Sequence, residues 1–207
     1  MNLIFVGPQG SGKGTYGKMI SEKLCVPHIS MGDLLRNYNG KHKDEIQALM
    51  KAGKLGPLAL TLEIIKERLS ESDAKKGFIL DGFPRNLEQA RELDKIAKVD
   101  KVIDIEVPED LTIKRLNGRW SCPKCGTPYN IYFDDKPKVS GICDKDGEKL
   151  VQRADDADIN VIKARLQVYH SETEPILDYY TKKVIVINGD QHKDKAVEDI
   201  LNKVRKG

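Results

Sequence analysis

The sequence predicts an α/β fold in which a doubly wound, five-stranded parallel sheet is flanked by helices. Two observations predict it. Short apolar runs rich in β-branched residues alternate with longer segments whose apolar residues recur at helical spacing. A glycine-rich turn stands directly between the first run and the first helical segment, at the edge where an open α/β sheet binds its ligands.

The runs and the helical segments follow one another along the whole chain. Uninterrupted apolar runs are typical of parallel strands buried on both faces. The expected strands are 2–6, 28–30, 77–81, 101–107 and 184–188. The expected helices are 13–24, 58–70, 86–98, 109–117, 159–182 and 192–206. Pro175 should kink or interrupt the fifth helix, because proline donates no backbone hydrogen bond.

Two segments do not follow this alternation and are expected as insertions at the rim of the sheet. Residues 31–56 are polar and helical in pattern, with no strand of their own. Residues 118–153 are rich in Cys, Pro, Gly, Asp and Tyr. We therefore expect one core made of residues 1–30, 57–117 and 154–207, and two small inserted units.

Composition and charge exclude several classes of protein. The 35 Lys and Arg nearly balance the 32 Asp and Glu, giving a net charge of +3, so charge alone indicates no nucleic-acid or membrane partner. No apolar run approaches the roughly 18 residues that a membrane helix needs. No pattern of a signal peptide opens the chain. We expect a soluble, cytoplasmic protein.

The glycine-rich turn has the features of a phosphate-binding loop: Gly7-Pro8-Gln9-Gly10-Ser11-Gly12-Lys13-Gly14-Thr15. Glycines let backbone N–H groups surround a phosphate, a helix N-terminus favours negative charge, and Lys13 adds a cation. An ordinary glycine-rich turn is the alternative, but strand, glycines, lysine and helix coincide here. Gly14 stands where most such loops carry a Mg²⁺-binding hydroxyl, and Thr15 supplies one a residue later. That displacement disfavours a GTPase or a motor.

Further motifs follow this loop along nearly the whole chain: Ser30-Met31-Gly32-Asp33-Leu34-Leu35-Arg36, Ala52-Gly53-Lys54-Leu55, Asp81-Gly82-Phe83-Pro84-Arg85 with Gln89 one helical turn on, Leu116-Asn117-Gly118-Arg119, and Arg153-Ala154-Asp155-Asp156. Together with Gly12-Lys13-Gly14-Thr15, they resemble the nucleoside monophosphate kinases, and the adenylate kinase family above all. The resemblance implies reversible transfer of a phosphoryl group from ATP to AMP with Mg²⁺. It also implies that residues 31–56 bind the monophosphate and that residues 118–153 form a lid.

The resemblance also assigns residues to roles. The residues implied in catalysis are Lys13, Arg85, Arg119, Arg153 and Arg165. Those implied in ATP binding are Gly10, Ser11, Gly12, Lys13, Gly14, Thr15, Arg115, Arg119, Pro128, Tyr129 and Gln191. Those implied in AMP binding are Met31, Arg36, Lys54, Leu55, Gly56, Gly82, Phe83, Pro84, Arg85, Gln89, Arg153 and Arg165. One extra residue separates Arg165 from Arg153 relative to the usual spacing, so Arg165 is assigned by its context.

Arginine suits this chemistry because its planar fork binds phosphate oxygens in pairs and keeps its charge. For any single arginine a structural salt bridge is the alternative. Arg68, Arg91 and Arg205 fall on helix faces and are expected to be solvated. Asp81 ends a strand, where a carboxylate can orient Mg²⁺ through water together with Thr15; capping of the next segment is its alternative role. No general base is apparent, and a phosphate acceptor needs none.

The segment 118–153 contains two similar turns, Cys122-Pro-Lys-Cys125-Gly and Cys143-Asp-Lys-Asp146-Gly. Three thiolates and a carboxylate can complete a tetrahedral Zn²⁺ site with no open position, which predicts a structural metal. A redox pair of Cys122 and Cys125 is the alternative, but such a pair usually opens a helix. The arrangement resembles the zinc-bearing lids of some bacterial adenylate kinases. Cys25, after the first helix, is expected to pack as a small buried residue.

The sequence departs from the family at the side that would face the AMP base. Met31 stands where threonine is usual, and Gly56-Pro57-Leu58 replaces a stretch that usually begins with valine. We therefore expect a relaxed choice of monophosphate. Two alternatives remain: a P-loop kinase with another acceptor, and a zinc-ribbon protein that binds nucleic acid. Acidic residues among the aromatic ones of the ribbon disfavour the second. Oligomeric state is not indicated.

Overall fold

A computed structural model describes residues 1–52, 54–133, 135–153 and 156–206. A five-stranded parallel sheet lies at its centre, with the strand order β2-β3-β1-β4-β8. These strands are β1 (Asn2–Val6), β2 (His28–Ser30), β3 (Phe78–Asp81), β4 (Lys101–Glu106) and β8 (Val184–Asn188). The predicted parallel sheet is thus confirmed, with each strand within a residue of its expected bounds.

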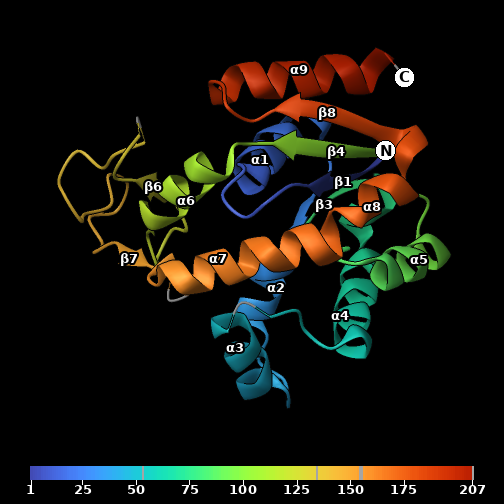
Figure 1. Cartoon of the computed structure of the whole chain (residues 1–207), viewed down its shortest axis with the longest axis horizontal. Coiled ribbons are helices and arrows are strands. Elements are labelled where there is room, and N and C mark those ends of the chain that lie inside the picture. Colours follow the sequence, from blue (N-terminus) through green and yellow to red (C-terminus); the bar gives the residue numbers. More distant parts are fainter. Residues whose placement is uncertain (53, 134, 154–155, 207) are drawn as a thin grey trace.

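Alternate residues of the central strands enter two separate cores, one on each face of the sheet. On β1, Leu3 and Phe5 pack against α1 (Lys13–Leu24) and α9 (Lys193–Lys206). The intervening Ile4 and Val6 belong to the opposite core. That core is closed by α4 (Leu58–Ser70), α5 (Leu87–Ile96) and α8 (Pro175–Tyr179). In Figure 1, α9 and α1 lie on one side of the strands and α4 and α5 on the other. Burial on both faces is why β1 is apolar from Leu3 to Val6.

Two small units extend from this sheet. The first consists of α2 (Met31–Asn37) and α3 (Lys43–Lys51), which project from the body of the molecule in Figure 1. The second contains an antiparallel sheet with the order β6-β5-β7, made of β5 (Arg119–Ser121), β6 (Pro128–Asn130) and β7 (Val151–Gln152). It follows α6 (Glu109–Asn117). Gly53, predicted in a monophosphate-site motif, lies outside the described residues, as do Ala154 and Asp155.

The long C-terminal helical segment is interrupted at Pro175, as predicted. It consists of α7 (Ile159–Val168), a π-helical turn η3 (Tyr169–Thr173), α8 and a short 3₁₀ turn η4 (Thr181–Lys183). Pro175 is the first residue of α8, a position at which its missing N–H leaves no helical hydrogen bond unmade. A further 3₁₀ turn, η1 (Ser72–Lys76), precedes β3. No helix among the described residues has both the length and the apolar character needed to cross a membrane.

Two expectations about surface residues were wrong. Cys25 is exposed rather than buried, because it caps α1 in the left-handed conformation (φ 53°), donating its N–H to the carbonyl of Ser21. Arg68 is not merely solvated: its guanidinium donates to both carboxylate oxygens of Asp73, at 2.9 and 2.8 Å, and so joins α4 to η1. The pairing depends on the turn after the helix, which helical periodicity alone does not predict.

A close packing contact under the phosphate loop gives a testable prediction about stability. A Cβ at Gly17 of α1 would lie 2.4 Å from Cδ2 of the buried His28 ring, so Gly17→Ala should lower the free energy of unfolding by about 1–3 kcal/mol. Helix propensity alone predicts the opposite, a gain of about 1 kcal/mol. Denaturant titration distinguishes the two, and His28→Ala in the same chain should recover the loss. A single Gly17→Ala variant as stable as the wild type would contradict the packing argument.

Candidate functional site

A cavity of about 950 Å³ opens at the carboxyl ends of β1, β2 and β3. Its walls come from the glycine-rich loop, from α2 and α3, and from β5 and β6. Nearly every residue predicted for nucleotide binding lines it. The exception among the described residues is Ser11, which belongs to the loop but is fully buried.

The glycine-rich loop has a backbone that only glycine adopts readily. Gly7, Gly10 and Gly12 have φ values of 145°, 86° and 103°, and Gly12 is the N-cap of α1. The Lys13 ammonium donates to the carbonyls of Gly7 and Pro8, at 2.6 and 2.8 Å. The pKa of Lys13 is lowered to about 8, mainly by burial, with smaller contributions from the charges of Arg85, Arg119 and Arg165; the charge of Asp81 opposes this shift. Lys13 therefore lies among cations that favour its neutral form.

A single buried carboxylate holds two of the predicted arginines in place. Asp156, with no exposed surface, accepts from Nε and Nη2 of Arg119 at 2.7 and 2.8 Å and from Nη1 of Arg165 at 2.9 Å. The structure thus brings Arg165 beside Arg119, despite its unusual sequence spacing. Asp156 belongs to one of the motifs recognised in the sequence, but its role there was not predicted. An acid just after an arginine motif, at the start of a helix, is the signal that could have identified it.

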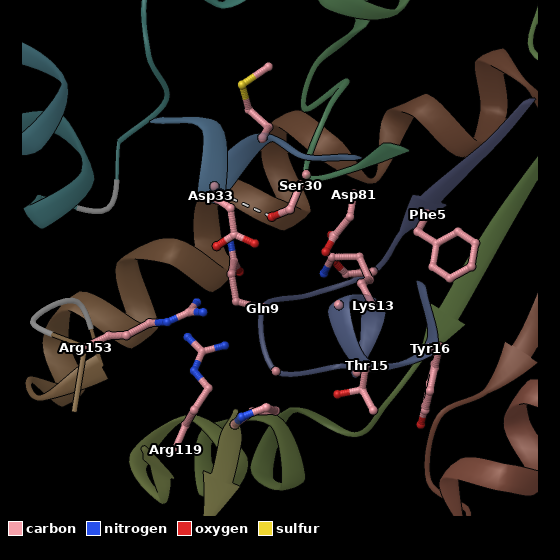
Figure 2. Close-up of a pocket in the computed structure, with 18 of the residues that line it drawn as sticks. Phe5, Gln9, Lys13, Thr15, Tyr16, Ser30, Asp33, Asp81, Arg119 and Arg153 are labelled. Atoms are coloured by element: carbon pink, nitrogen blue, oxygen red, sulfur yellow. Dashed lines mark hydrogen bonds between the residues drawn. The ribbon is translucent and has the colours of Figure 1, made fainter. Parts of the chain in front are cut away.

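Arg153 completes this group from the end of β7. Burial lowers the pKa of Arg153 to about 10, with a contribution from the nearby charges of Arg119 and Arg36. Figure 2 shows the guanidinium groups of Arg119 and Arg153 pointing toward one another across the cavity. Two cations oriented in this way repel each other unless an anion lies between them.

Two further arginines approach the cavity from the side of β3 and α2. Arg36 pairs with Asp33 one turn earlier on α2, whose first turn is capped by Ser30. Arg85 donates from Nε to the carbonyl of Gly82, at 2.9 Å. Gly82 has φ 75°, and a Cβ there would lie 3.1 Å from Nη2 of Arg85. The missing side chain therefore leaves room for the guanidinium at the cavity wall.

Gln89 and Met31 lie at the end of the cavity nearest α2 and α5. The Gln89 side chain is almost fully buried, and its Oε1 accepts from the backbone N–H of Arg85 at 2.7 Å. Met31 is also buried and presents no hydrogen-bonding hydroxyl. Lys54, Leu55, Gly56, Phe83 and Pro84 line the same region.

Asp81 lies beside a histidine that the sequence analysis did not connect to it. Burial acts to raise the pKa of Asp81, but the adjacent His28 imidazole and the charge of Lys13 lower it on balance. The His28 Nε2 is 3.5 Å from Oδ2 of Asp81, and Figure 2 shows Lys13 extending to the same carboxylate. The parallel pairing of β2 with β3 creates this contact, so it could not be read from adjacent residues. The result is an ionised carboxylate beside Gly14 of the loop.

The opposite end of the cavity has a different character. Arg115 donates from Nη2 to the carbonyl of Gly189 at 3.0 Å, and its guanidinium lies 6.0 Å from the centre of the Phe133 ring. Pro128, Tyr129 and Gln191 also line this end. The hydroxyl of Tyr129, however, faces the cysteines rather than the cavity.

The four predicted metal ligands come together in the small antiparallel unit. Cys122, Cys125, Cys143 and Asp146 each offer one ligand atom, all within 4.8 Å of one another. The two turns have matching hydrogen bonds: Gly126 N–H to Cys122 carbonyl and Gly147 N–H to Cys143 carbonyl, both 3.0 Å. Sulfur and carboxylate donors gathered in this way fit a tetrahedral Zn²⁺ ion.

Around these ligands, Tyr129 supplies a second layer of hydrogen bonds. Its hydroxyl donates to Sγ of Cys143 at 3.5 Å and accepts the N–H of Asp144 at 2.8 Å. Burial acts to raise the pKa of the Cys143 thiol, but this hydroxyl and two backbone N–H groups lower it on balance. Partners of this kind orient metal ligands and favour their charged form.

Comparison with known proteins agrees with this geometry. The model of the adenylate kinase family matches residues 5–185. The chain is 45% identical to the adenylate kinase of Clostridium tetani over 213 residues, which is 98% of this chain and 97% of the relative. It is 46% identical to the adenylate kinase of Staphylococcus aureus strain Mu50 over 215 residues, 98% of this chain and 99% of the relative. The adenylate kinase of Staphylococcus epidermidis strain ATCC 12228 is 45% identical, with 99% and 97% coverage.

The lowered pKa of Lys13 predicts that a polyanion is bound together with a proton. At pH 9 most Lys13 side chains are neutral in the free protein, because their pKa is about 8. A bound phosphate chain raises that pKa, so the ammonium re-forms. Calorimetric titration with tripolyphosphate in buffers of different ionisation enthalpy should show proton uptake by the protein that is larger at pH 9 than at pH 6.5. Lys13→Arg, whose side chain stays charged, serves as the reference. Equal values for the two proteins would contradict the assignment.

Proposed function

The chain belongs to the adenylate kinase family, and we propose that it catalyses the reversible reaction of ATP with AMP to give two ADP in the cytoplasm. The observation that carries the proposal is one cavity lined by the phosphate loop and by Lys13, Arg119 and Arg153. In the reaction, a phosphate oxygen of AMP bonds to the γ-phosphorus of ATP. The bond from that phosphorus to the bridging oxygen of the β-phosphate breaks, and ADP leaves.

The chain's own residues supply alignment and charge. Gly10, Gly12, Gly14 and Thr15 surround the ATP phosphates, and Ser11 supports the loop from behind. Arg36 and Arg85 hold the phosphate of AMP, while Lys13, Arg119, Arg153 and Arg165 neutralise charge on the migrating group. Arg115, Pro128, Tyr129 and Gln191 lie along the ATP base and ribose. The AMP base lies against Met31, Lys54, Leu55, Gly56, Gly82, Phe83, Pro84 and Gln89.

Asp81 and Thr15 would hold Mg²⁺ through water. The ionised state of the Asp81 carboxylate, maintained by His28 and Lys13, supports this assignment. When bound with ATP, the ion neutralises charge on the β- and γ-phosphates. His28 is a positioning residue here, because it contacts the carboxylate rather than the nucleotide.

Residues 31–56 and 118–153 form the two moving units of this proposal, around a core of 1–30, 57–117 and 154–207. Both carry cations that face the cavity, Arg36 in the first and Arg119 and Arg153 in the second. Closure of these units over the nucleotides would exclude water, so that the phosphoryl group passes to AMP and is not hydrolysed.

Met31 supports a relaxed choice of monophosphate. Its thioether packs against a base but supplies no directional hydrogen bond. Compared with threonine at this position, that loss lowers the discrimination between AMP and other monophosphates by about 1 kcal/mol. Gln89 retains an amide that faces the same region, with its oxygen already occupied by the N–H of Arg85. The chain would therefore accept GMP, CMP or UMP more readily than a chain with threonine at this position.

A coupled assay of ADP formation tests both the activity and the choice of acceptor. With ATP and Mg²⁺ fixed, the wild type should phosphorylate AMP, and Met31→Thr should raise the ratio of kcat/KM for AMP over GMP about fivefold. No turnover of AMP by the folded wild type would refute the activity. A strict AMP preference that Met31→Thr leaves unchanged would refute the role of Met31.

We further propose that Cys122, Cys125, Cys143 and Asp146 hold a structural Zn²⁺ ion. Four protein ligands leave no position open for a substrate. The unit they belong to has only a small apolar cluster, which includes Tyr129, Leu150 and Trp120, and so small a core needs a further link to stay folded. The metal would therefore stabilise the unit that carries Arg119 and Arg153.

Removal of the metal should act on stability more than on chemistry. Chelation, or Cys143→Ser, should lower the melting temperature by several degrees. For a chain of this size, that shift corresponds to a loss of about 1–3 kcal/mol in the free energy of unfolding. The kcat at temperatures below both transitions should change much less. Cys25→Ser is the matched control, since Cys25 is exposed and distant from the cluster in sequence; it should retain the full zinc content. Unchanged melting after zinc removal would contradict a structural role.

A further inference from the structure

Gln9 lines the cavity at the tip of the phosphate loop but has no part in the roles proposed above. It occupies the second position of a β-turn in which the Ser11 N–H donates to the Pro8 carbonyl at 3.1 Å. Gly10, in the third position, has the positive φ (86°) that a type II turn requires there. The second position of such a turn accepts most residue types. The turn alone therefore does not explain a glutamine.

The Gln9 side chain has an unsatisfied acceptor. Its Oε1 is buried and makes no hydrogen bond to any described residue. A buried acceptor without a donor is unfavourable unless a partner arrives in another state of the protein. The cavity offers such partners, because it is lined by guanidinium groups and would, under the proposed function, receive phosphate groups.

The direction of the side chain indicates which ligand it would meet. Figure 2 shows Gln9 extending from the loop toward Asp33 of α2, into the space that Arg119 and Arg153 also face. Thr15 and Lys13 lie on the other side of the loop in the same view. Asp33 is paired with Arg36, which belongs to the side of the cavity proposed for AMP. Gln9 thus points away from the part of the loop that would hold the ATP phosphates.

We propose that Gln9 contacts the acceptor substrate: its amide N–H₂ donates to a phosphate oxygen of the bound monophosphate, and its Oε1 accepts from a guanidinium of the closed lid. This inference rests on the proposed function. A carboxamide suits the position because it adds donors without adding another cation to a crowded positive site. Its effect is to align the phosphate of the acceptor with the γ-phosphoryl group above the loop.

Steady-state kinetics and direct binding on three variants test the contact. Gln9→Leu removes the donors at similar size and should raise the KM for AMP about tenfold, with the KM for ATP changed less than about twofold. Gln9→Asn keeps the amide on a shorter stem and should fall between wild type and Gln9→Leu. The control is Gln167→Leu, an exposed position on α7 away from the cavity, which should match the wild type.

Gln9→Glu distinguishes a contact with the substrate from a purely structural role, because it should change stability and AMP binding in opposite directions. A carboxylate among these cations should raise the melting temperature of the nucleotide-free protein, while it repels the acceptor phosphate and weakens AMP binding beyond Gln9→Leu. Calorimetric titration with AMP alone measures that binding without turnover.

The results separate the two proposals. If the wild type forms ADP but the Gln9→Leu and Gln9→Glu variants bind AMP as it does, the contact is refuted and the proposed function stands. An equal rise in KM for both nucleotides also refutes it, because that result indicates distortion of the whole loop. If the folded wild type forms no ADP, the proposed function fails, and the contact fails with it.

Discussion

Mutual repulsion among the cations around one cavity is the constraint on which the rest of this structure depends. Lys13, Arg119 and Arg153 line a common cavity. Burial lowers the pKa values of Lys13 and Arg153, and the charges of neighbouring arginines add to this effect. Buried acids stabilise this cluster of cations. Asp156 accepts hydrogen bonds from the guanidinium groups of Arg119 and Arg165, and the negative charge of Asp81 attracts the Lys13 ammonium. Electrostatic groups that are already in place need no reorganisation when negative charge arrives, and such preorganisation is a main source of catalysis in phosphoryl transfer.

The fold places the phosphate loop on the central sheet and several of the arginines on the two small units that extend from it. The loop and Asp81 are attached to strands whose side chains are buried on both faces of the sheet. Arg36, Arg119 and Arg153 instead belong to the small units that extend from it. Neither unit has a large core, so each depends on local devices: the Ser30 cap in one, and the cysteine cluster with its Tyr129 hydrogen bonds in the other. These features hold the arginines of each unit in a fixed direction.

Sequence reasoning predicted what is encoded locally. The five strands, the loop with its glycines, the interruption at Pro175 and the four clustered candidate ligands follow from patterns within short segments. It did not predict contacts that depend on register or on turns. The pairing of His28 with Asp81 requires that β2 lie beside β3. Asp156 and Arg119 are 37 positions apart in the sequence. The conformations around Cys25 and Arg68 depend on how their helices end. The sequence places Gln9 in the loop, but the direction of its side chain follows only from the fold.

The central claim is that both nucleotides place their phosphates in the same cation-lined cavity. Titration calorimetry with a compound in which five phosphates join two adenosines tests it most directly, since that compound spans both sites at once. The account predicts one molecule bound per chain, with a Kd about 100-fold or more below that of ATP or AMP alone. Two molecules per chain, or an affinity no higher than that of ATP, would contradict it.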